Sequence, residues 1–182
     1  MSKVVVHSLF TDFDIDLFKG GKHYRLYDKL GSHPIEVDGI KGTYFAVWAP
    51  SAKAISVVGD FNGWNHEDHV LNVRWDSSGI WEGFIPNIGH GEKYKYKIQS
   101  HNQDIWTEKA DPFAKQCEHP PKTASLIWSS DYKWKDKDWM GYRKEKNGLD
   151  RPYSVYEVHL GSWKRDADGN FLTYRQLAVD LV

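Results

Sequence analysis

The chain has 182 residues, of which 40% are apolar and 27% are charged, as in an ordinary globular protein. Its 24 basic and 25 acidic side chains nearly cancel, which argues against a nucleic-acid partner. No apolar stretch has the length of a membrane span, so no membrane partner is expected. Cys117 is the only cysteine, so no internal disulfide can form, and we expect a cytoplasmic protein.

Residues 1–33 are predicted to form a helical lead-in. Residues 11–30 have helical spacing, with Thr11 or Asp12 as the N-cap. The apolar side chains on one side of this helix are Phe13, Leu17 and Phe18. Gly31 is well placed to end the segment, because glycine adopts the left-handed conformation that commonly closes a helix.

From Gly42 the apolar residues recur with a period of two, which is typical of strands, and we predict one β domain over residues 34–128. The predicted strands are 43–49, 54–59, 80–85, 93–100, 105–107 and 124–128. Turn signals separate them at 62–63, 77–79 and 101–102. Short strands at this spacing predict a mainly β protein, built on an Ig-like antiparallel β-sandwich.

Residues 129–153 are polar and rich in Lys and Asp, and we interpret them as a linker. Residues 155–160 then favour a buried strand, and a helix with a capping box at Thr173 and Gln176 follows. A strand followed by a helix is half of a βαβ unit. Residues 154–182 are therefore predicted to begin a larger α/β domain that the chain does not complete.

Trp64 follows an Asn-Gly turn, where a rigid backbone could present its indole for stacking against a sugar ring. Lys97, on the charged face of its strand, and Trp106, just past the next turn, could join it if the strands are neighbours. Two indole faces and one ammonium donor suit a sugar chain. The alternative is that both tryptophans pack into the core and that Lys97 only solvates the surface.

A nucleic-acid, metal or cofactor site has less support in the sequence. Lys and Tyr alternate in 93–97, but they lie on opposite faces of one strand and cannot bind one nucleic-acid ligand together. Glu157 and His159 share a face of the late strand, yet nothing near them has metal-ligand spacing, so we assign no metal. The chain has no phosphate-binding glycine loop, and no cofactor is expected.

Several motifs resemble a known family. Residues 42–50, ending in Trp-Ala-Pro, and 57–64, with Gly-Asp-Phe-Asn-Gly-Trp, resemble the glycogen-associated carbohydrate-binding module that precedes the barrel of amylase-superfamily enzymes. Residues 156–163 and 172–178 resemble the first strand and helix of that (β/α)8 barrel in 1,4-α-glucan (glycogen) branching enzymes. Residues 23–34 are similar to the lead-in of the same enzymes.

The resemblance implies the N-terminal part of an enzyme that cleaves an α-1,4-glucan and transfers the segment to a 6-hydroxyl. Such retaining chemistry needs two carboxylates about 5 Å apart. In the family these come from later barrel strands, so the resemblance implies no catalytic residue here and an inactive chain. The implied partners are α-glucan and the remainder of the catalytic barrel.

In regulatory glycogen-binding relatives, the residues that bind sugar match Trp64, Lys97 and Trp106. Two alternatives remain open at this point. One is a non-catalytic glycogen-binding regulatory module, and the other is an Ig-like interaction domain without affinity for sugar.

Overall fold

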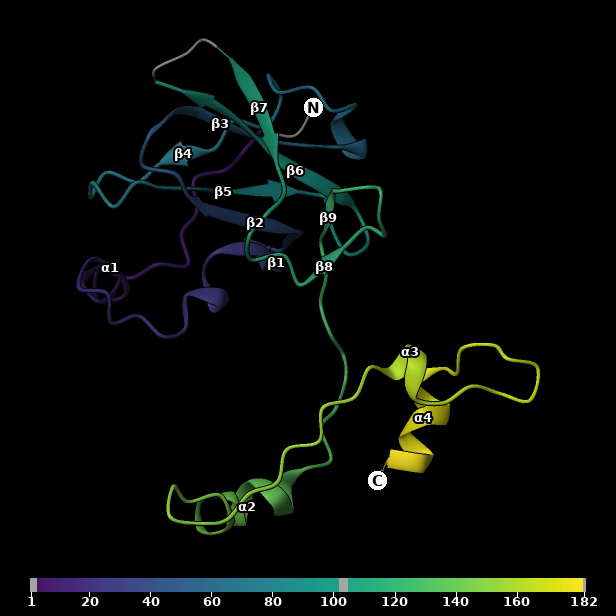
Figure 1. The fold of residues 1–182 in the computed structure, drawn as a ribbon. Helices are drawn as coiled ribbons and strands as arrows, with labels where there is room; N and C mark the ends of the chain where they lie inside the picture. Colours follow the sequence, from purple (N-terminus) through teal and green to yellow (C-terminus); the bar gives the residue numbers. More distant parts are fainter. Residues whose placement is uncertain (1–2, 102–104, 182) are drawn as a thin grey trace. The chain divides into compact units, whose positions relative to one another are not determined.

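A computed structural model describes residues 3–101 and 105–181. The chain divides into two compact units, Met1–Asp131 and Tyr132–Val182 (Figure 1). The first unit contains all of the strands that are described, and the second contains three short helices. Over the described residues, no helix combines the length and the apolar character that crossing a bilayer requires.

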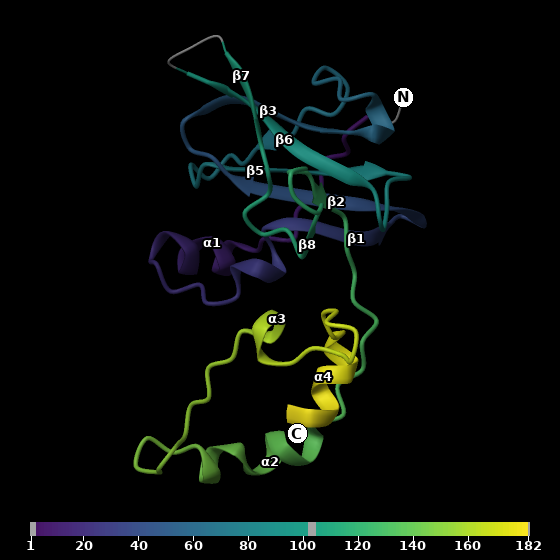
Figure 2. The same ribbon diagram turned by 45° about the vertical axis from the view of Figure 1, so that its right-hand side comes forward.

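The first unit is built from two antiparallel sheets (Figures 1 and 2). One has the strand order β1 (Gly31–Val37), β2 (Ile40–Trp48), β5 (Ile80–Pro86) and β4 (Asn72–Val73). The other has the order β3 (Ala52–Gly59), β6 (Lys93–Ser100), β9 (Ser125–Leu126) and β8 (Gln116–Cys117), and β7 (Trp106–Lys109) pairs with β6. The predicted mainly β, antiparallel architecture is confirmed.

Side chains from both sheets form the main core. Phe45 on β2 packs edge-to-face against Tyr94 on β6, with ring centroids 5.1 Å apart. Tyr94 and Tyr96 are fully buried, while the alternating lysines Lys93, Lys95 and Lys97 are only partly buried. The alternation along β6 therefore gives this strand one core face and one charged face, as its sequence predicts.

The opposite face of β2 is buried as well. Tyr44 and Ala46 belong to a second cluster with Phe10 and Ile15, which lie before and within helix α1 (Asp12–Lys19). The Tyr44 hydroxyl donates a hydrogen bond to the buried carboxylate of Glu82. Because α1 covers one face and the second sheet covers the other, β2 has a continuous buried run instead of alternating exposure.

Helix α1 is shorter than the predicted helix and buries a different residue. Thr11 is the N-cap, and Asp14 completes a capping box with it. The helix ends at Lys19, and a separate 3₁₀ turn, η1 (Leu26–Asp28), follows. Phe13, predicted on the apolar side, is 70% exposed, because Ile15 is the residue that faces the sheet.

Strand β1 is an edge strand that the sequence analysis missed. It pairs with β2 through a two-residue turn at Asp38 and Gly39, both with positive φ, as a type I′ hairpin requires. Pro34 lies within β1 and lacks an N–H, which proteins accept on edge strands. The short strands β4 and β8 were also missed. Of the turn predicted at 101–102, residue 102 lies outside the described residues.

The second unit departs from the prediction in two places. Residues 152–159 have no regular structure and no described strand pairs with them, so the strand predicted at 155–160 is not formed in this chain. A helical turn, α3 (Leu160–Trp163), takes the end of that segment. Helix α2 (Lys137–Lys146) lies in the predicted linker. Helix α4 (Tyr174–Leu181) begins as predicted, with the Thr173 amide donating to the Gln176 side chain at 2.8 Å.

Substituting Gly59→Ala should destabilise the sandwich. Gly59 pairs with Tyr94, and an added Cβ would overlap the Lys93 carbonyl oxygen and the Phe61 ring. Overpacking of this kind costs about 1–3 kcal/mol. The free energy of unfolding measured by chemical denaturation should fall by that amount. The control Gly89→Ala meets no atom within 4 Å and should stay within about 0.5 kcal/mol of the parent; equal effects of the two changes would contradict this account of Gly59.

Asp14 should make the fold sensitive to acid. Burial raises the pKa of Asp14, but hydrogen bonds from Thr11, Lys29 and His23 outweigh it and hold the pKa well below its ordinary value. A lowered pKa adds stability that is present at neutral pH and is lost as the pH falls below about 4.

We therefore expect Asp14→Asn to lower stability at pH 7, with the difference from the parent shrinking toward pH 2. Denaturation measured as a function of pH checks this expectation. The control is Asp16→Asn, on the same helix but with an exposed side chain. A difference between parent and Asp14→Asn that is independent of pH would contradict the role given to this carboxylate.

Candidate functional site

The charged face of the second sheet brings two of the three predicted residues together. Strand pairing aligns Lys97 on β6 with Glu108 on β7, and it aligns Gln99 with Trp106. Residues directly opposite each other in an antiparallel pair share a face, so Lys97 and Trp106 lie on the same face as diagonal neighbours. The sequence prediction required the strands at 54–59 and 93–100 to be neighbours, and β3 does pair with β6.

Lys95 and Lys97 on this face share one carboxylate, that of Glu108. The Lys97 ammonium lies 3.9 Å from Glu108, and that of Lys95 lies 3.5 Å from the other oxygen of the same carboxylate. The Lys97 side chain is 23% exposed. The face therefore offers ammonium donors beside a carboxylate acceptor, a combination that can hydrogen-bond the hydroxyl groups of a neutral ligand.

His66 positions the indole of Trp106. The two rings are 4.5 Å apart between centroids, with an interplanar angle of 51°. The carbonyl of His66 accepts a hydrogen bond from the hydroxyl of Ser56, which lies opposite Lys97 on β3. The loop after β3 is thus attached to the same face of the sheet, and Trp106 is half-buried against it.

Asn62 fixes the shape of that loop. It ends the 3₁₀ turn η2 (Asp60–Asn62), and its side-chain oxygen accepts from the Gly59 amide at 2.9 Å. Its side-chain nitrogen donates to the Val57 carbonyl at 3.0 Å and contacts the buried His69 ring at 2.9 Å. The Asn-Gly signal therefore marks a rigid loop, as the sequence predicts.

Trp64 belongs to this loop but does not reach the other two predicted residues directly. Its indole N–H donates to the Asp60 carboxylate at 2.9 Å, and Asp60 lies 3.7 Å from the Lys93 ammonium. Among the described residues, no hydrogen bond, ion pair or ring contact joins Trp64 to Lys97 or Trp106. The connection runs through His66, two residues along the chain from Trp64 and in contact with Trp106.

The sequence analysis assigned nothing to His66 or Glu108. Glu108 could have been identified, since it follows Trp106 by two residues in a strand and must share its face. His66 could not, because only the folded loop brings it against Trp106. Within the described ranges, no group of three or more His, Cys, Asp or Glu side chains is arranged to hold a metal ion.

A comparison with known families shows which family the sandwich resembles. Residues 29–114 match the family model described as carbohydrate-binding module 48 (isoamylase N-terminal domain). The matched segment is similar to carbohydrate-binding module 48, and it includes β1 to β7 with Trp64, Lys97 and Trp106.

Curated relatives extend the similarity beyond the module. The chain is 52% identical over 171 residues to the 1,4-alpha-glucan branching enzyme of Albidiferax ferrireducens, covering 94% of this chain and 27% of the relative. It is 50% identical to that of Aquifex aeolicus, with the same coverage of 94% and 27%. The resemblance to branching enzymes is thereby confirmed as homology, and the chain spans about a quarter of the length of these relatives.

Among solved structures, the Klebsiella pneumoniae pullulanase complexed with maltotriose superposes on 56% of this chain and 10% of its own. Its sequence identity to this chain is 20%, and the TM-score is 0.45.

Proposed function

We propose that this chain is the glucan-binding N-terminal part of a glycogen branching enzyme. The observation that carries the proposal is an identity of about one half to branching enzymes over nearly the whole chain. The full activity is cleavage of an α-1,4-glucan and transfer of the segment to a 6-hydroxyl. To residues 1–182 we assign glucan binding and packing against the barrel. The protein is proposed to be cytoplasmic.

Within the module, the proposed glucan surface consists of Trp64, Lys97 and Trp106, supported by His66 and Glu108. An indole presents a flat apolar face to the C–H groups of a pyranose ring, while ammonium and carboxylate groups bind its hydroxyls. The shared face of Lys97 and Trp106 supports this assignment. The left-handed backbone of Gly63 and Trp64 supports it further, because a rigid loop loses little entropy on binding.

Residues 154–182 are proposed to form the first strand and helix of the (β/α)8 barrel, with the remainder of the barrel as partner. Val155 and Tyr156 are 78% and 71% exposed, which is unusual for residues with strand-favouring side chains. A parallel barrel strand needs hydrogen-bonding neighbours on both sides. Pairing with those neighbours would turn this segment into the strand that the sequence favours.

Trp106→Ala should weaken binding of maltoheptaose by about tenfold, because the substitution removes a stacking face. Trp64→Ala should weaken it by a similar factor, and Trp106→Phe should retain part of the affinity. Isothermal titration of the 182-residue chain measures these changes. The control is Trp134→Ala, an exposed tryptophan whose ring contacts Tyr132 in the second unit. Unchanged affinity in both Trp64→Ala and Trp106→Ala would remove this surface from the proposal.

The isolated chain should show no branching activity. Retaining transfer needs a nucleophilic carboxylate and an acid/base carboxylate about 5 Å apart, and the family resemblance assigns both to later barrel strands. Amylose incubated with the chain should keep its iodine absorbance spectrum, while a full-length relative should shift it. A shift with the purified chain would refute the assignment of catalysis to other parts of the enzyme.

A further inference from the structure

Trp75 is an exposed aromatic residue that the proposed surface does not use. It lies two residues after β4, on the edge of the first sheet, and is 84% exposed. Among the residues that the structure describes, no hydrogen bond or ring contact engages its indole. Single exposed apolar residues are common on protein surfaces. Trp75 is distinguished by the rigid backbone that carries it and by the cavity that it lines.

The backbone around Trp75 is held firmly. The neighbouring Arg74 donates to the Asp76 carboxylate at 2.7 Å and to the Glu82 carboxylate at 2.6 Å. All three of these charged side chains are at most 9% exposed. The Arg74 amide also donates to the Ile80 carbonyl at 2.9 Å, which closes the hairpin. The indole therefore projects from a fixed base.

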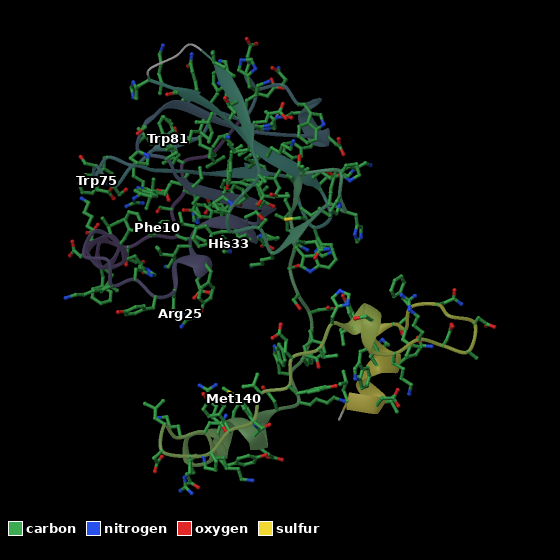
Figure 3. All side chains as sticks on the ribbon, viewed as in Figure 1. Phe10, Arg25, His33, Trp75, Trp81 and Met140 are labelled. Carbon is green, nitrogen blue, oxygen red and sulfur yellow. The ribbon has the colours of Figure 1, made fainter. Side chains whose placement is uncertain are left out.

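A cavity of about 400 Å³ lies beside this indole. Phe10 and Val73 supply apolar lining, while His7, Asp12 and Asn72 supply polar groups. Figure 3 labels Phe10 and Trp75, which line this cavity from the segment before α1 and from the hairpin after β4. The volume lies within the range of about 300–1,000 Å³ that is usual for small-ligand sites.

The charges around the cavity favour a neutral ligand. The only guanidinium in its lining, that of Arg74, is already neutralised by two carboxylates, and Asp12 adds a further negative charge. An anionic ligand such as a phosphate would find no free cation among these lining residues. A neutral polyol with one apolar face fits the stacking surface of Trp75 and the hydroxyl-binding groups of Asp12 and Asn72.

We propose that Trp75 and this cavity form a second α-glucan-binding site, separate from the Lys97 and Trp106 surface. This inference rests on the proposed function, because it takes the ligand class from there. The two sites belong to different sheets: Trp75 follows β4 of the first, and Trp106 begins β7 of the second. Two sites on one module raise the avidity for a long or branched glucan without requiring either site to bind tightly.

The indole N–H resonances of ¹⁵N-labelled protein test this site during titration with maltoheptaose. The Trp75 resonance, assigned by its loss in Trp75→Ala, should shift together with that of Trp106. Trp75→Ala should reduce the calorimetric stoichiometry from two sites to one. The remaining site should stay within about twofold of its parent affinity, because distant sites act independently.

A control variant and the Trp106 resonance distinguish failure of the second site from failure of the proposed function. Trp134→Ala, which removes a similarly exposed indole, should leave both sites intact. A Trp75 resonance that does not move while that of Trp106 does would overturn the second site and leave the proposed function standing. If neither resonance moves, both the proposed function and the second site fail.

Discussion

The burial of β2 on both faces is the constraint on which the first unit depends. Phe45 and Val47 point into the sandwich, while Tyr44 and Ala46 point toward α1 and the segment before it. One strand therefore belongs to two apolar clusters, and the N-terminal segment is part of the domain's packing. The bond from Tyr44 to Glu82 adds to this coupling, since Glu82 also binds Arg74, which anchors the hairpin that carries Trp75.

The loop after β3 shows how backbone conformation prepares a surface. Asn62 satisfies several backbone groups at once, and Gly63 and Trp64 both take positive φ. Non-glycine residues adopt this conformation rarely, and they keep it only where surrounding bonds enforce it. The bond from Ser56 to His66 then fixes the far part of the loop on the sheet, where His66 meets Trp106. The loop after β3 therefore holds this conformation without a bound ligand.

The sequence predicted the elements whose structure depends on residues close together in the chain. The alternation along 93–100 located β6 and separated its tyrosines from its lysines, and the Thr173 and Gln176 pair located the start of α4. Each remaining predicted strand of the sandwich lies within three residues of its observed bounds. Strand β1 was missed, although Asp38 and Gly39 carried a hairpin signal that could have identified it. Periodicity revealed neither the lack of a strand at 155–160 nor the contact of His66 with Trp106, because strand pairing and loop contacts involve residues outside the local pattern.

Pro34 has a consequence for contacts between copies of this chain. An open sheet edge displays rows of unpaired amides and carbonyls, which a second chain can extend into a continuous ribbon. Proline interrupts such a row, because it has no hydrogen to donate and its ring obstructs an approaching strand. With this residue in β1, the outer margin of the sandwich resists self-association through its backbone. Under the proposed function, copies gathered on one glucan particle would not join edge to edge.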